Sequence, residues 1–170
     1  MRRNFHKDHK QSQQEQLSPW WVDLYKQAFP NYHSMEVVTD ITLQKTGIDR
    51  IITLDDGHTI AIEEKVRYTV YPDILLEYRS TQTATGWINK ALHCDYITYV
   101  FYPSKTAHIL PYQLLRRAWH EHKDNWLKQY KHIPGRNSGY TSMSIAVPIT
   151  VLKQALFDAS HVSFAHRADL

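Results

Sequence analysis

The sequence predicts an α/β fold in which helices flank a mixed central sheet, and three observations lead to this prediction. Apolar, β-branched runs at 50–54 and 59–62 enclose an Asp-Gly pair. A helical pattern precedes them at 20–29, and another separates strands predicted at 74–79 and 95–102. A short turn makes strands antiparallel neighbours, whereas a helix between two strands allows a crossover. The expected order is helix, three strands, helix and strand (αβββαβ), followed by C-terminal strand–helix additions.

The first helix has a clear start signal. Ser18 is a favourable N-cap, and Pro19 suits the first helical position. The helix is expected to run from Trp20 to about Phe29, with one apolar stripe formed by Trp21, Leu24, Tyr25 and Ala28. Residues 32–45 are not assigned, because 35–41 fits a short strand and a connection equally well.

The hairpin of residues 46–67 is the strongest local feature. Asp56-Gly57 lies between the two apolar runs, and Asp-Gly favours a tight hairpin because both residues tolerate positive φ. Pairing these strands brings Asp49, which opens the first, close to the end of the second.

The remaining chain is predicted to alternate strands and helices. The apolar run at 74–79 predicts a third strand with both faces covered. A crossover helix is expected near 87–92 and a fourth strand at 95–102. Further elements are a strand at 107–110, a helix with a basic face at 112–131, a loop at 133–139, a strand at 142–147 and a helix ending near 157.

Composition bounds the class of protein. The chain has 170 residues, 42% hydrophobic and 22% charged, which predicts one folded domain at 17–170 behind a flexible basic tail at 1–16. Cys94 is the single cysteine, so an intrachain disulfide is excluded. The chain shows no membrane-spanning run and no signal-peptide pattern, so an intracellular, cytoplasmic protein without a membrane partner is expected.

Ionisable groups gather at one end of the predicted hairpin. Because strand side chains alternate faces, Glu63 and Lys65 point the same way, with α-carbons about 6.6 Å apart. Asp49 would lie close to them across the pair. Two carboxylates and an ammonium group at one place suit a metal and water site.

These residues resemble the PD-(D/E)XK nuclease superfamily, which has the restriction-endonuclease-like fold. Asp49, the fourteen-residue step to Glu63, and Glu63-Glu64-Lys65 as (D/E)-x-K match its motif. The resemblance covers about residues 18–102, leaves 103–170 as an elaboration, and is greatest to small phage-encoded and mobile-element nucleases. Two departures are Ile48 in place of proline, and Glu64 where the family usually has an apolar residue.

The resemblance implies a metal-dependent endonuclease or exonuclease that hydrolyses phosphodiester bonds, with DNA favoured over RNA as the partner. Asp49 with Glu63 or Glu64 would hold Mg²⁺ or Mn²⁺, and Lys65 would position water or stabilise charge on the phosphate. The choice between Glu63 and Glu64 stays open. Asp23 and Glu77 are accessory candidates, and a homodimer fits the family's habits.

Basic side chains suggest where nucleic acid would bind, because Lys and Arg supply most non-specific affinity. The candidates are Arg67, Arg79, Lys90, Arg116 and Arg117. A net charge of +3 is compatible with this, although a basic helix face is often only solvated.

Two other interpretations stay open. The chain could be a non-catalytic nucleic-acid-binding module with a nuclease-like fold, or an interaction protein in which the hairpin charges only pair with each other. A zinc protease is excluded because His120 and His122 are two apart and point to different sides of a helix. Glycine-rich phosphate loops and G-x-S-x-G are absent from the sequence.

Overall fold

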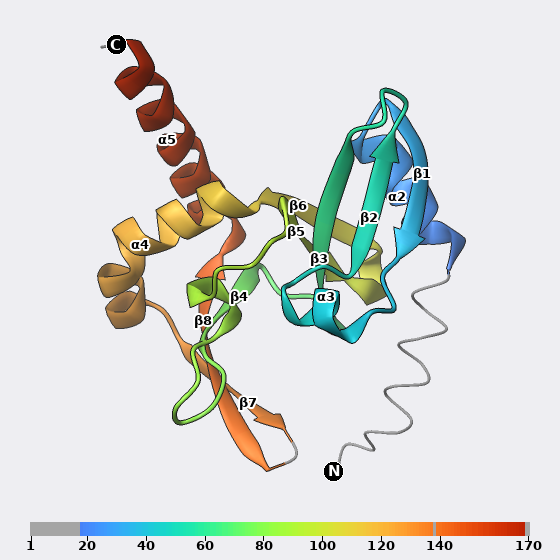
Figure 1. The fold of residues 1–170 in the computed structure, drawn as a ribbon. Helices are drawn as coiled ribbons and strands as arrows, with labels where there is room; N and C mark the ends of the chain where they lie inside the picture. The colour runs from blue at the N-terminus through green and yellow to red at the C-terminus, as the bar shows by residue number, and fades with distance from the viewer. Residues whose placement is uncertain (1–17, 138, 169–170) are drawn as a thin grey trace.

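The computed structural model describes residues 18–137 and 139–168 and is mixed α/β (Figure 1). The tail predicted at 1–16 lies outside the described residues. The elements, in chain order, are α2 (Pro19–Ala28), β1 (Tyr32–Val37), α3 (Ile41–Lys45), β2 (Arg50–Leu54), β3 (Thr59–Arg67), β4 (Asp73–Arg79), the 3₁₀ turn η1 (Trp87–Asn89), β5 (Tyr96–Phe101), the 3₁₀ turn η2 (Tyr102–Ser104), β6 (Thr106–Pro111), α4 (Tyr112–Gln129), β7 (His132–Asn137), β8 (Tyr140–Pro148) and α5 (Ile149–Ala168).

The central sheet has five strands in the order β1-β2-β3-β5-β6. Strands β3 and β5 pair in parallel, and the other neighbours pair antiparallel. The predicted mixed sheet with flanking helices is therefore present. Strand β1 fills part of the segment 32–45 that the sequence pattern leaves unassigned.

The β2–β3 hairpin forms in the predicted place, with Arg50 opposite Ile62 and Thr53 opposite Thr59. The Gly57 amide donates to the Leu54 carbonyl at 2.9 Å, and the Leu54 amide donates to the His58 carbonyl at 2.8 Å. Gly57 has φ +84°, whereas Asp56 does not have positive φ. The prediction of a tight turn with positive φ at both Asp56 and Gly57 is therefore wrong. The loop is longer than two residues, and Gly57 alone of the pair is left-handed.

A second sheet corrects three predictions. It has the order β4-β8-β7, so the strand at 74–79 does not join the central sheet. The predicted loop at 133–139 contains β7, an edge strand that accommodates Pro134. The crossover helix expected at 87–92 is only the short 3₁₀ turn η1. Its apolar residues Trp87 and Ile88 are both buried within this single turn, so they do not form the apolar stripe of a longer helix.

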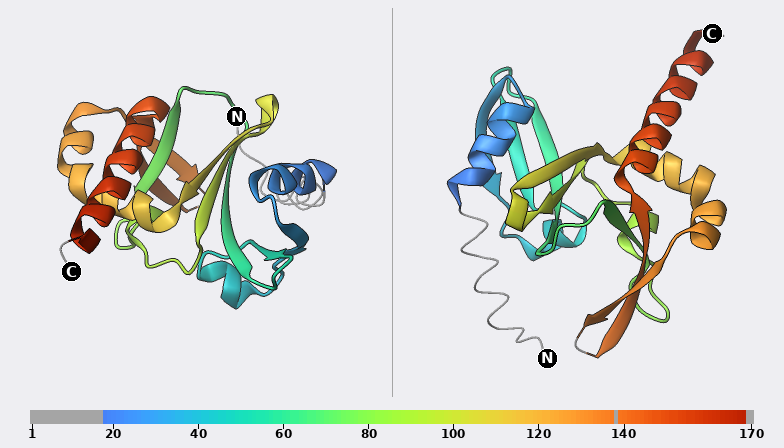
Figure 2. Two further views of the ribbon diagram at one scale, coloured as in Figure 1. Left: turned by 90° about the horizontal axis from the view of Figure 1, so that it is seen from above. Right: turned by 180° about the vertical axis from the view of Figure 1, so that it is seen from behind.

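Helices cover the central sheet on both faces (Figure 2). Helix α2 packs on one face, where Trp21 and Tyr25 join a core with Ile52, Ile62 and Val100. Of the predicted α2 stripe, Ala28 is exposed instead of buried. The second sheet, α4 and α5 form a larger core against the opposite face.

Helices α4 and α5 continue the chain on that larger core. Helix α4 occupies the predicted segment. Helix α5 extends to Ala168 rather than ending near 157, because residues 158–168 contain no glycine or proline to stop it. No helix in the described part of the chain is long and apolar enough to span a membrane.

Candidate active site

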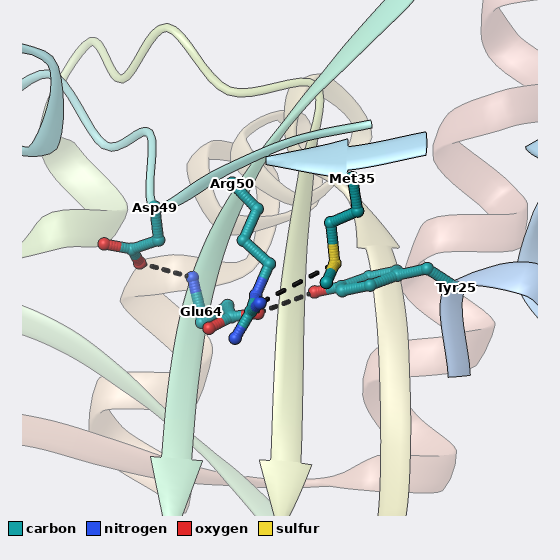
Figure 3. A network of polar contacts seen from close by, with 5 residues as sticks. All are labelled: Tyr25, Met35, Asp49, Arg50 and Glu64. Carbon is teal, nitrogen blue, oxygen red and sulfur yellow. Dashed lines mark hydrogen bonds and ion pairs between the residues drawn. The ribbon is translucent and has the colours of Figure 1, made fainter. Parts of the chain in front are cut away.

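The Asp49 carboxylate is fixed against the edge of β3 (Figure 3). Its Oδ2 atom accepts a hydrogen bond from the Glu64 amide at 2.8 Å, and the Asp49 amide donates to the Ile62 carbonyl at 2.8 Å. Gly47, with φ +85°, turns the chain from α3 into β2 just before Asp49, and a Cβ on Gly47 would lie 2.9 Å from Leu92. The turn and the two hydrogen bonds therefore hold the carboxylate beside Glu63 and Glu64.

Glu63 and Lys65 lie on the same face of β3, as the alternation of strand side chains predicts. The Lys65 ammonium donates a hydrogen bond to the Glu63 Oε1 atom in a close ion pair. Glu63 is buried, with its side chain 11% exposed, while the Lys65 side chain is 28% exposed. Burial raises the pKa of Glu63, the Lys65 charge opposes that effect, and the neighbouring Asp49 carboxylate adds to it.

Glu64 points to the opposite face, toward α2 (Figure 3). Its Oε1 atom accepts hydrogen bonds from Arg50 Nε at 2.5 Å and from the Tyr25 hydroxyl at 2.9 Å. The Arg50 guanidinium also lies 4.6 Å from the Trp21 ring centroid. Burial raises the pKa of Glu64, although Arg50 and Tyr25 oppose that rise by stabilising the carboxylate. The two glutamates of the motif therefore face different surroundings.

A cavity of about 580 Å³ lies between the Glu63 face of β3 and the second sheet. Its lining combines acidic and basic groups with apolar walls. The charged lining residues are Lys45, Glu63, Glu64, Lys65, Arg67, Glu77 and Lys90. Leu75, Trp87, Leu92 and Tyr99 form apolar parts of the wall, and Gly135, Ser142 and Ser144 belong to the β7–β8 hairpin.

The structure brings some of the predicted binding residues to this cavity and leaves others away from it. Arg67 lines it and pairs with Asp73 through Nη1 and Oδ1 at 2.8 Å. Glu77 and Lys90 also line the cavity. Asp49, Asp23, Arg79, Arg116 and Arg117 do not belong to the described lining. Asp49 reaches the site through its hydrogen bond to the Glu64 amide, whereas Asp23 is exposed on α2, which packs on the far face of the sheet.

Hard oxygen donors are available beside this cavity. Within residues 18–137 and 139–168, no group of three or more His, Cys, Asp or Glu side chains is placed to hold a metal ion. Asp49 and Glu63 form a pair of neighbouring carboxylates. Because the amide and carbonyl of one strand residue point the same way, the Glu64 carbonyl projects from the β3 edge that Asp49 occupies. Mg²⁺ commonly takes one or two carboxylates and completes its shell with water and phosphate oxygens, so this donor set fits it.

Sequence reasoning gave no role to Arg50, Tyr25 or Lys45. Arg50 could have been found, because a charge in an apolar strand needs a buried partner. The hairpin register places Arg50 opposite Ile62, and Glu64 lies two residues farther on the same face. For Tyr25, the helix pattern predicts burial but gives no hydrogen-bond partner. Nothing in the local sequence predicts that Lys45 lines the same cavity as Glu63.

Comparison of this chain with protein-family models, with curated proteins and with solved structures found no match.

Proposed function

We propose that the protein is a metal-dependent nuclease that hydrolyses phosphodiester bonds in DNA. Asp49 and Glu63 would hold Mg²⁺ or Mn²⁺ with the Glu64 carbonyl, and Lys65 would act on the phosphate and the attacking water. The observation that carries the proposal is the juxtaposition of the Asp49 carboxylate, fixed on the β3 edge, with the Glu63–Lys65 pair at a cavity.

The assignment of Glu63 rather than Glu64 as the acidic metal ligand rests on their surroundings. Both glutamates line the cavity and feel the Asp49 charge, but the Glu63 side chain lies on the cavity face of β3, where it pairs with the partly exposed Lys65. A divalent cation would relieve the repulsion between the Asp49 and Glu63 carboxylates. The Glu64 carboxylate is instead engaged by Arg50 and Tyr25 on the other face, so Glu64 would contribute only its main-chain oxygen.

Each group has a distinct part in the proposed hydrolysis. When bound, a divalent cation supplies stabilisation of the charge that develops on the phosphoryl oxygens, and it makes water more acidic. Lys65 can turn from Glu63 toward a non-bridging phosphate oxygen and donate a hydrogen bond to it. Asp49 and Glu63 would hold the cation, and as carboxylates they can accept hydrogen bonds from the attacking water; the Glu64 amide fixes Asp49 for this role.

The order of elements adds support from the PD-(D/E)XK resemblance. Helix α2 and strands β1, β2, β3 and β5 follow the family's helix, three strands and parallel final strand, with Asp49 ahead of β2 and the acidic motif on β3. Three differences remain. The third strand of the match is β1 and not the expected strand at 74–79, α3 lies between β1 and β2, and the crossover between β3 and β5 contains β4 and η1 where the family has a helix.

Cleavage of labelled DNA tests the proposal. Plasmid, linear duplex, single-stranded and four-way-junction DNA would be incubated with Mg²⁺, Mn²⁺ or EDTA, with a parallel single-stranded RNA. We expect cutting of DNA that requires the metal and is abolished in Lys65→Ala, while Lys128→Ala, an exposed α4 lysine, cuts like the wild type. Absence of cutting on every substrate despite measurable binding would replace this proposal with a non-catalytic binding module.

A further inference from the structure

Aromatic side chains gather at one end of the central sheet, where β3 and β5 finish. Arg67 and Phe101 are paired at the ends of these parallel strands. Tyr68 follows β3 directly and Tyr71 lies in the connection to β4; the two residues are 47% and 46% exposed. Tyr102 follows β5 directly.

Three rings lie close to one another, those of Tyr68, Tyr102 and the α2 residue Trp20, and Lys105 lies against two of them. The Tyr68 and Tyr102 ring centroids are 5.9 Å apart, and those of Trp20 and Tyr102 are 6.4 Å apart. The Lys105 ammonium lies 3.2 Å from the Tyr102 centroid and 5.2 Å from the Trp20 centroid. We refer to Trp20, Tyr68, Tyr71, Tyr102, Arg67 and Lys105 as the ring platform.

Arg67 connects the ring platform to the cavity. Its guanidinium lies 4.4 Å from the Tyr71 ring centroid, and Arg67 is also part of the cavity lining. Glu63, Lys65 and Arg67 alternate along one face of β3, with successive α-carbons on that face about 6.6 Å apart. A bound chain molecule can therefore extend from the exposed rings along this strand to the candidate site.

The chemistry of the ring platform suits unpaired bases. Proteins that bind single strands combine aromatic rings, on which bases stack, with cations that follow the phosphates. In a duplex the faces of the bases are covered by their neighbours, so exposed rings can reach them only after unstacking. The cavity volume, about 580 Å³, falls in the range of about 300–1,000 Å³ that small ligands occupy, so it has room for one or two nucleotides.

We propose that the ring platform binds a single, unpaired DNA strand and leads it to Glu63 and Lys65. This inference specifies the substrate of the proposed nuclease. Binding of the strand is independent of that proposal, whereas delivery of the strand to Glu63 and Lys65 rests on it. The strand source would be single-stranded DNA or the unpaired arm of a branched molecule. The bases stack on the exposed rings of Tyr68 and Tyr71. Lys105 contacts the phosphates, and Arg67 exchanges its Asp73 contact for a phosphate oxygen.

Fluorescence anisotropy tests the inference with the full chain in EDTA, so that no cleavage occurs. The probes are a labelled oligothymidylate, a duplex hairpin of equal length, and the same hairpin with an unpaired arm. We expect the oligothymidylate and the armed hairpin to bind more tightly than the plain duplex. Tyr71→Ala and Tyr68→Ala should each weaken strand binding by about 5- to 150-fold, whereas Tyr71→Phe, which keeps the ring, should bind like the wild type.

Tyr140→Ala is the matched control, because Tyr140 has the same 46% exposure as Tyr71 but lies at the start of β8. All variants would be compared by thermal unfolding to show that they are folded. Equal binding of strand and plain duplex, or unchanged strand binding in both alanine variants, would overturn the inference. Equal losses in Tyr71→Phe and Tyr71→Ala would overturn stacking as its basis.

The same proteins in Mg²⁺ separate this inference from the proposed activity. Strand binding that depends on the ring platform, without any cleavage, would leave the inference standing and overturn the nuclease. Equal cleavage of single strand and duplex, unchanged in the Tyr68 and Tyr71 variants, would support the nuclease and overturn the inference about the ring platform.

Discussion

The Glu64 amide donates a hydrogen bond to the Asp49 carboxylate at 2.8 Å, so a site carboxylate is held by the backbone of the strand that carries the acidic motif. The side chain of Glu64 is anchored on the other face by Arg50 and Tyr25 (Figure 3). Packing against α2 and the position of Asp49 are thereby linked through one residue.

The buried Arg50–Glu64 pair should be important for folding. Their side chains are 1% and 5% exposed, and removal of one partner leaves a buried charge uncompensated. We expect Glu64→Ala to lower the free energy of unfolding by about 3–5 kcal/mol in urea denaturation. Glu36→Ala, which removes an exposed carboxylate from β1, should change it by less than about 0.5 kcal/mol.

A double-mutant cycle checks the pairing itself. If the two side chains stabilise each other, the loss in Arg50→Ala with Glu64→Ala is smaller than the sum of the single losses. Additive losses would show that the ion pair does not couple the two strands.

The pH dependence of stability should reveal the buried state of Glu63. Its pKa is raised in the folded protein, so between the unfolded value of about 4.3 and the raised folded value the native state binds more protons than the unfolded state. Stability contributed by this group is therefore present below about pH 4.3 and is lost as pH rises through the folded pKa. The free energy of unfolding of Glu63→Gln should not show this loss, because glutamine does not titrate. We therefore expect the variant to be more stable than the wild type at neutral pH.

The unfolding difference between wild type and Glu63→Gln would be measured in urea at a series of pH values. Subtraction removes the contribution of Glu64, which is present in both proteins and has a raised pKa of the same sign. A difference that is constant with pH, or that grows in favour of the wild type as pH rises, would contradict the burial of an ionisable Glu63 beside Asp49.

Divalent metal should stabilise the folded protein if Asp49 and Glu63 bind it. A ligand that binds only the native state adds RT ln(1 + [L]/Kd), about 2.7 kcal/mol at 100 times Kd. We expect Mg²⁺ or Mn²⁺ to raise the Tm of the wild type and to have little effect on Asp49→Asn and Glu63→Gln. Equal shifts in all three proteins would place the metal elsewhere on the chain.

Lys65 should matter for chemistry more than for binding. We expect Lys65→Ala to slow single-turnover cleavage by about 10²–10⁴-fold, since its ammonium would act on the reacting phosphate, while DNA affinity falls far less. Lys45→Ala removes another cation from the same cavity and should weaken affinity with a small effect on the rate at saturation. Similar rate losses in both variants would assign Lys65 a general electrostatic role instead.

The hairpin and the positions of its charges could be predicted because both are local. The turn and the alternation of strand residues put Glu63 and Lys65 together and send Glu64 to the other face. The Asp-Gly pair alone does not determine the turn, because loop length and register together set its geometry. The open choice between the two glutamates could also have been narrowed, because the hairpin register brings Arg50 and Glu64 onto the same face.

The partners of the later strands could not be read from local patterns. The apolar run in β4 predicts burial on two faces, but the same pattern fits either sheet, and its partner β8 lies far along the chain. Trp87 and Ile88 have a spacing that suits a helix and also a single buried 3₁₀ turn. The cavity between the two sheets was therefore unpredictable, and so was the meeting of Lys45, Arg67 and Glu77 around it.

The most direct test of the proposed nuclease is the single-turnover cleavage rate of Asp49→Asn beside the wild type, at saturating Mg²⁺ and DNA. This change keeps the size of the side chain and an oxygen that can accept the Glu64 amide, but removes the charge. We expect cleavage by the wild type and a rate at least about 100-fold lower in the variant. Equal rates in the two folded proteins would contradict a site built on Asp49.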